Sequence, residues 1–209
     1  MLMALGTAER RQGLRLALID AAERAVARGG LQALKARELA EAVGCALGAI
    51  YTVFPNLDAL IFEVNARTLR DFEAFAGRSA AASAEPGDSP AVAELVRLAL
   101  LYLDYAAANR PRWSALFEHR MAAAESAVPE WYATEQARLF ALVEAPLGTL
   151  CPGIGREQAM VYARTLFSGV HGIVSLGLDE KLVGLPLAAL KAQVGWFVRV
   201  FGRGLAGQG

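Results

Sequence analysis

The chain has 209 residues, and its 21 basic and 21 acidic side chains give a formal net charge of zero at pH 7. It therefore lacks the basic excess of a protein that binds nucleic acid mainly through charge. Its longest stretch without a charged side chain, 42–57, contains Gly, Pro and Asn and is shorter than the roughly 20 apolar residues of a membrane span. We predict no transmembrane helix and, because no secretory signal is recognisable, a cytoplasmic protein.

Residues 39–60, LAEAVGCALGAIYTVFPNLDAL, have the pattern of two short helices joined by a turn. Apolar side chains recur there at helical spacing, and we expect four of them to face one core: Ala40, Val43, Leu47 and Ile50. Gly44 stands where the first helix must end and the backbone must turn. The pattern predicts a helix-turn-helix, whose second helix enters the major groove of DNA.

The charge of this N-terminal region is slightly basic. Residues 1–57 carry seven basic and five acidic side chains, a difference of seven minus five, or +2. Arg10, Arg11 and Arg15 cluster near the N-terminus, where a first helix can lie along phosphates. We expect modest DNA binding that weakens with salt.

The remaining chain shows helical patterns and no strand pattern, so we predict an all-α fold. Residues 58–76 form an amphipathic helix pattern, and the segment 77–90 has the composition of a loop. Further helices are predicted at 91–108, 112–124, 129–146, 156–178 and 186–203, with an interhelical loop at 148–155. Pro111, Pro129 and Pro186 fall near predicted helix starts, where a missing N–H costs least.

The predicted helix 156–178 has apolar and small residues on every side. Such a helix is buried from two directions, and a second copy of the chain is the simplest source of the second layer. We expect the last helix to join it in a four-helix homodimer interface. Ser168, Gly169 and Gly172 would permit the close approach of helices.

Roughly residues 10–65 resemble the DNA-binding domain of tetracycline-repressor (TetR) family regulators. The matching positions are Gly30, Leu31, Ala33, Leu34, Leu39, Ala40, Gly44, Gly48, Tyr51, Phe54 and Leu60. The chain departs from the family pattern where Lys35, Ala46, Val53 and Leu57 replace capping, polar or basic residues. The resemblance implies a three-helix DNA-binding domain at 1–57 and a helical effector-binding and dimerisation domain at 58–209.

The resemblance also implies which residues contact double-stranded operator DNA. We expect Tyr51 and Thr52 to meet the bases and Lys35 and Arg37 to contact phosphate. The full set of expected DNA-binding residues is Lys35, Arg37, Ala46, Leu47, Gly48, Tyr51 and Thr52. The function implied is that of a repressor, released from its operator by a small apolar effector.

The region of Phe167, His171 and Gly172 resembles a TetR subgroup in which a Trp precedes a His-Gly pair; here Phe167 replaces the Trp. This likeness implies a pocket for a small molecule. Aromatic residues crowd the middle helices, and our predicted lining is Tyr102, Trp113, Phe117, Trp131, Phe167 and His171. The alternative for each is an ordinary core position, and for His171 a core histidine whose ring nitrogens have partners.

Nothing in the sequence indicates an enzyme, a metal site or a cofactor. The two histidines, His119 and His171, belong to no zinc-binding pair, and no phosphate-binding loop or serine nucleophile motif is present. Cys45 and Cys151 lack metal-ligand spacing, and we expect no disulfide between them. The rival function is a helical small-molecule-binding or interaction protein that has lost specific DNA binding, which Ala46, Val53 and Leu57 motivate.

Overall fold

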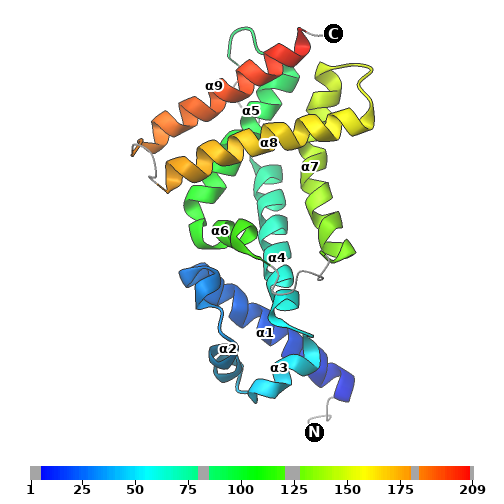
Figure 1. Ribbon diagram of the computed structural model, residues 1–209, viewed down its shortest axis with the longest axis vertical. Coiled ribbons are helices and arrows are strands. Elements are labelled where there is room, and N and C mark those ends of the chain that lie inside the picture. Colours follow the sequence, from blue (N-terminus) through cyan, green and yellow to red (C-terminus); the bar gives the residue numbers. More distant parts are fainter. Residues whose placement is uncertain (1–5, 80–84, 121–127, 180–183, 208–209) are drawn as a thin grey trace. The chain divides into compact units, whose positions relative to one another are not determined.

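Figure 1 shows a computed structural model of the chain, which describes residues 6–79, 85–120, 128–179 and 184–207. These residues form helices and no strand, which confirms the all-α prediction. The elements are α1 (Thr7–Gly29), the 3-10 helix η1 (Leu31–Ala33), α2 (Ala36–Val43), α3 (Leu47–Val53), α4 (Leu57–Arg78), α5 (Pro90–Ala108), α6 (Arg110–Glu118), α7 (Glu130–Leu150), α8 (Arg156–Leu178) and α9 (Leu187–Ala206).

The chain forms two compact units. Unit 1 contains Met1–Arg70 and Asn109–Tyr132, and unit 2 contains Asp71–Ala108 and Ala133–Gly209. The backbone therefore passes between the units three times, and α4 and α7 each contribute residues to both. The division into a DNA-binding domain at 1–57 and a second domain at 58–209 stays a prediction.

Unit 1 is organised around an apolar core that α1, α2, α3, α4 and α6 share. Its buried members include Leu18, Ala22, Val26, Leu39, Ile50, Leu60, Val64 and Ala115. α2 ends at Gly44, whose φ of 70° lies in the left-handed region that suits glycine, and α3 follows after two residues. The predicted helix-turn-helix is thus present.

One of the four residues expected in this core is not there. Ala40 and Ile50 are buried and Val43 packs against them, but Leu47 is 43% exposed. The prediction for Leu47 was wrong because its spacing was counted across the turn at Gly44, where helical periodicity is interrupted. Leu47 is the first residue of α3 and faces solvent on its outer side.

α6 belongs to unit 1. Trp113 and Ala115 are buried, and Ala115 contacts the core cluster that α1 and α3 form. The Arg112 guanidinium lies 3.0 Å from a carboxylate oxygen of Glu23 on α1. The predicted helix 112–124 is shorter in the structure, because α6 ends at Glu118, and residues 121–124 lie outside the described residues.

A charged network joins α1 to α4 beside this contact. One nitrogen of Arg67 lies 2.6 Å from Asp20 and 2.7 Å from Glu23. Burial of the guanidinium opposes its charged form, but the hydrogen bonds to Glu23 and Asp20 outweigh this and raise the pKa of Arg67. Glu23 therefore holds arginines from both α4 and α6 on α1.

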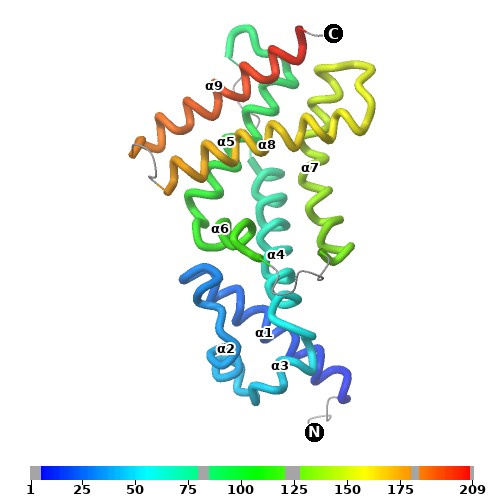
Figure 2. The backbone as a smooth tube through the Cα atoms, in the orientation of Figure 1, coloured from blue at the N-terminus to red at the C-terminus, as the bar shows by residue number. Residues whose placement is uncertain are grey.

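In unit 2, α9 packs against both α5 and α8. Figure 2 traces the chain along α8 and back along α9. At two glycines of α8 the side chains of α9 occupy the space that a Cβ would need: Phe197 lies over Gly169, and a Cβ on Gly177 would be 2.5 Å from Leu190. Gly169 thus serves packing within one chain, which corrects its predicted place between two chains. At Gly172 an added Cβ would meet nothing within 4 Å.

The helix ends outside the turn region agree with the predicted ranges to within a few residues. The largest difference is at α6, which ends at Glu118 and not at 124. The next is at α7, which continues to Leu150 with Pro146 inside it, so the loop predicted at 148–155 is reduced to residues 151–155. Pro111 lies in the first turn of α6, and Pro129 and Pro186 directly precede α7 and α9. The prolines therefore mark helix starts as predicted.

The close contact at Gly169 generates a stability prediction. Gly169→Ala places a methyl group against the Phe197 ring, and overpacking of this kind costs about 1–3 kcal/mol. The matched control is Gly148→Ala on α7, where the added methyl meets nothing within 4 Å and should stabilise the helix by up to about 1 kcal/mol. Thermal unfolding should show a lower Tm for the first variant and an equal or higher Tm for the second. A raised Tm for Gly169→Ala would contradict this packing.

Candidate functional site

The seven residues predicted to bind DNA all lie on the surface of unit 1. Lys35 and Arg37 are exposed around the start of α2, and Ala46, Gly48 and Thr52 are exposed around α3. The larger side chains of α3 are open as well, with Tyr51 50% and Leu47 43% exposed. Ile50, on the opposite side of α3, is fully buried. The burial of one face thus leaves a continuous exposed face on the other.

Polar contacts restrict what some of these side chains can offer. The Thr52 hydroxyl donates to the Ala49 carbonyl oxygen at 2.7 Å, so its proton is used within α3. The Lys35 ammonium lies 3.2 Å from Glu38, with both side chains largely exposed. Such an exposed pair contributes little to stability, and a phosphate can displace the carboxylate. α2 has no side-chain cap, as Lys35 led us to expect, and α3, which follows Ala46, has none either.

The three arginines near the N-terminus differ in their surroundings. Arg10 and Arg11 are exposed on α1. Arg15 forms an ion pair with Glu63 on α4, and its guanidinium lies 5.2 Å from the centre of the Phe54 ring. Arg15 therefore stabilises the packing of unit 1, and the expectation that the three arginines lie along phosphates stays a prediction.

Three of the six predicted effector-contact residues meet in unit 2. The Phe167 ring stacks on His171 at 5.8 Å between centroids, and the Tyr102 ring meets Phe167 edge-on at 5.5 Å. The Tyr102 hydroxyl lies 2.8 Å from Nδ1 of His171. α5 and α8 thus bring together a phenol, a phenyl ring and an imidazole.

The aromatic cluster is larger than the sequence indicated. Phe140 of α7 meets Phe167 at 5.4 Å, and Phe72 of α4 meets both Tyr102 at 5.9 Å and Tyr105 at 5.4 Å. The sequence predicted a helix over 58–76, which contains Phe72, but did not assign this residue to the site. Only the packing of α4 against α5 reveals the association, because no local spacing relates the two helices.

His171 is a neutral side chain near pH 7, because burial lowers its pKa below the ordinary value. A hydrogen bond joins the Tyr102 hydroxyl to Nδ1 of the neutral ring, and its direction depends on which ring nitrogen carries the proton. The imidazole is therefore oriented by its hydrogen bond with Tyr102.

The other three predicted effector residues lie in unit 1. Trp113 of α6 is only 3% exposed and meets Phe117 edge-on at 5.5 Å. Phe117 is exposed, as is Trp131 at the start of α7, where it contacts Tyr132 at 5.8 Å. The predicted lining is thus divided between the two units, and contact of these three side chains with an effector stays a prediction.

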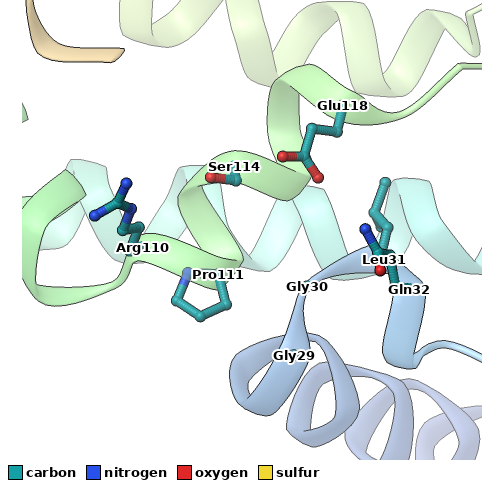
Figure 3. A pocket seen from close by; sticks show the side chains of 8 residues that line it. All are labelled: Gly29, Gly30, Leu31, Gln32, Arg110, Pro111, Ser114 and Glu118. Atoms are coloured by element: carbon teal, nitrogen blue, oxygen red, sulfur yellow. The ribbon is translucent and has the colours of Figure 1, made fainter. Parts of the chain in front are cut away.

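A small pocket in unit 1 was not predicted from the sequence. Figure 3 shows that the pocket lies between α6 and the segment in which α1 ends and η1 begins. Its volume is about 280 Å³. The lining residues are Gly29, Gly30, Leu31, Gln32, Arg110, Pro111, Ser114 and Glu118. Gly30 has a φ of 68°, the conformation that ends α1 and turns the chain into η1. The pocket depends on the packing of α6 on α1, which the sequence does not indicate.

Comparison with known families covers both parts of the chain. Residues 18–64 match the family described as bacterial regulatory proteins, tetR family, and residues 95–201 match the tetracyclin repressor-like C-terminal domain. The chain belongs to the TetR family. No curated protein sequence matches it.

Solved structures share the fold of this TetR-family chain. A protein of unknown function from Rhodococcus sp. RHA1 has a TM-score of 0.67 and 22% identity, with 99% of each chain covered. A tetR-family transcriptional regulator from Streptomyces coelicolor has a TM-score of 0.63 and 20% identity, covering 98% of this chain and 85% of its own. A TetR variant from Acinetobacter baumannii in complex with minocycline has a TM-score of 0.59 and 17% identity, with 96% of each chain covered.

The family assignment explains the two sites in outline. The TetR DNA-binding match contains α2 and α3, and the C-terminal match contains Tyr102, Phe167 and His171. The protein is therefore a TetR-type transcriptional regulator with a ligand-binding C-terminal domain, and regulators of this family generally act without catalysis.

Neither a metal site nor a single membrane-spanning helix is found in the part of the chain that the structure describes. No group of three or more His, Cys, Asp or Glu residues there could hold a metal ion. No individual helix in the described ranges is long and apolar enough to cross a membrane; α3 and α4 pass that test only as a pair, bent by 67°.

The environment of His171 predicts how stability depends on pH. Its pKa is lowered in the folded protein, so the unfolded state binds a proton more readily below the ordinary value of about 6.5. Stability present above that pH should therefore be lost as the pH falls through 6.5. Urea unfolding at fixed protein concentration between pH 5 and 8 should show this loss in the wild type and a weaker loss in His171→Gln. The control His119→Gln should keep the His171 part; equal slopes for His171→Gln and wild type would contradict the assignment.

Proposed function

We propose that this TetR-family regulator is a repressor that binds operator DNA through α3 and leaves it when a small apolar effector binds unit 2. The observation that carries the proposal is the exposed face of α3. Ile50 is buried in the core while Tyr51, Leu47 and Gly48 are open, which is the orientation that entry into a major groove requires.

The proposed repressor is a homodimer that places one α3 in each of two successive major grooves. Support comes from apolar side chains exposed on the last two helices. Trp196 of α9 is 66% exposed, and Val200, Val161 and Leu176 are exposed on α9 and α8. An open stripe of α8 also includes Gly172, where nothing lies within 4 Å of an added Cβ, so a partner helix can approach closely.

The proposed effector site is the aromatic cluster of unit 2. Phe167 and Tyr102 offer ring faces and edges, and His171 adds a polar group that Tyr102 orients. The structural relative from Acinetobacter baumannii is a complex with minocycline. A small, mostly apolar effector suits an aromatic surface with a few hydrogen-bonding groups.

Release from DNA requires that the effector bind two conformations unequally, because a ligand with equal affinity for both shifts nothing. Two helices that are shared by the units could link effector binding in unit 2 to DNA binding in unit 1. α4 and α7 each continue from one unit into the other, and α6 returns the chain to the core of unit 1. In the proposed mechanism, a change at Phe72 or Phe140 in unit 2 acts on unit 1 through α4 and α7, which carry residues of both units.

Selection from a randomised duplex library tests DNA binding directly. The wild-type protein should enrich a defined site, and fluorescence polarisation at low salt should show tighter binding to that site than to unselected duplex. Tyr51→Phe removes one hydroxyl from the exposed face and should weaken binding about fivefold, the equivalent of one hydrogen bond. The matched control Tyr162→Phe, on α8, should bind like the wild type.

Two outcomes of the same titration would contradict the proposal. Binding no tighter than to random duplex would favour a helical small-molecule-binding protein that has lost DNA recognition. A panel of apolar small molecules added to the complex should include at least one that lowers the polarisation. Failure of every molecule to do so, with DNA binding intact, would remove the effector from the proposal.

The dimer is tested by Trp196→Glu. A charge in the centre of an apolar interface must be desolvated, so this variant should dissociate into monomers in sedimentation experiments and bind the selected duplex weakly. The control is Ala141→Glu, which places the same charge at an exposed position on α7. If Trp196→Glu sediments like the wild type, the dimer does not use this face.

A further inference from the structure

The exposed face of α3 carries few groups that can read bases by hydrogen bonds. Residues 46–53 have the sequence ALGAIYTV, without Arg, Lys, Asn, Gln, Asp or Glu. The commonest specific contacts in the major groove are Arg or Lys to guanine and Asn or Gln to adenine, each through two hydrogen bonds. None of these contacts is available from α3 or the residue that precedes it.

Of the two polar residues of α3, Tyr51 and Thr52, only one has a side-chain hydrogen-bond donor left for DNA. Thr52 uses its hydroxyl proton within the helix, at 2.7 Å from the Ala49 carbonyl oxygen. The Tyr51 side chain, 50% exposed, therefore carries the hydroxyl proton that remains for DNA on this face. A single phenol distinguishes few base pairs, so most of the discrimination has to come from another kind of contact.

The rest of the face is apolar and open. Leu47 is 43% exposed, Ala46 is exposed directly before it, and an added Cβ on Gly48 would meet nothing within 4 Å. In the major groove, the apolar group that distinguishes one base from the others is the C5 methyl of thymine. An apolar surface placed in that groove gains by covering these methyl groups and loses where it covers unpaired polar edges.

We propose that α3 recognises its operator through thymine methyl groups, with Leu47 as the main contact and Ala46 beside it. This inference rests on the proposed function, because it requires that α3 enter the major groove. Lys35 and Arg37 then contact phosphates and set the position of the helix without contributing sequence information. The operator class that results has thymines at the positions facing Leu47, not runs of guanine.

The experiment uses the full-length wild-type protein and the site enriched from the randomised duplex library. That site is resynthesised with deoxyuridine in place of thymidine, one position at a time. Uracil lacks the C5 methyl and keeps the O4 acceptor, so the hydrogen-bond pattern of the groove is unchanged. At contacted positions each replacement should weaken binding about fourfold, as expected for one methyl group removed from water.

Leu47→Ala connects the effect to its residue. The variant should bind the thymidine and deoxyuridine duplexes almost equally, so that the fourfold ratio falls towards one at the position facing Leu47. The matched control is Leu16→Ala, which removes an equally exposed leucine from α1 and should keep the wild-type ratio. Because the deoxyuridine series needs no variant, the test remains decisive even if Leu47→Ala folds poorly.

The possible failures are distinct. If the library selection enriches no site, the proposed repressor function fails and this inference fails with it. If a site is enriched and every deoxyuridine duplex binds as tightly as its thymidine counterpart, the repressor stands and methyl recognition is wrong. Enrichment of guanine at the central positions would likewise overturn the inference while leaving DNA binding intact.

Discussion

The burial of Ile50 determines how the reading helix is presented. α3 has only seven residues, and helices of that length are not stable by themselves in water. Its first turn has no side-chain cap, since Ala46 stands at the capping position. The helix is therefore held by tertiary packing of one face, where Ile50 is enclosed by the core of unit 1. The exposed side chains of α3, such as Leu47, are not needed for this packing. They can therefore be apolar without destabilising the fold.

The second constraint is the position of Glu23 on α1. Its carboxylate lies close to Arg67 of α4 and to Arg112 of α6, and Arg67 also reaches Asp20. Partly buried charges that share partners are costly to separate, because each would lose its compensation. α1, α4 and α6 thus behave as one body within unit 1.

Local patterns predicted the elements and failed where the answer depends on distant packing. Gly44 marked the turn because its left-handed backbone is a local requirement, and the prolines marked helix starts for the same reason. Leu47 was misplaced because helical periodicity does not continue through that turn. Gly169 was recognised as a close-approach position, but its partner, Phe197 of the same chain, could not be read from spacing. The association of Phe72 with Tyr102 and the pocket beside Gly30 depend in the same way on which helices become neighbours.

The residues that depart from the family pattern remove polar groups without disrupting the helices of unit 1. At Lys35 and Ala46 the lost capping groups are compensated by core packing, and the start of α4 keeps its own cap, because Asn56 accepts from the Ala59 N–H at 2.8 Å. The absence of these polar side chains therefore does not prevent folding, and its expected effect is on hydrogen bonding to DNA. A surface that carries Ala46 in place of a polar residue, next to the exposed Leu47, offers fewer hydrogen bonds to purines and more apolar area. Apolar contacts depend little on salt, whereas phosphate contacts weaken as salt rises. Residues 1–57 carry a charge of only +2, so their phosphate binding is weak. With such a surface, the preference for one DNA sequence over another depends less on salt than the overall affinity does.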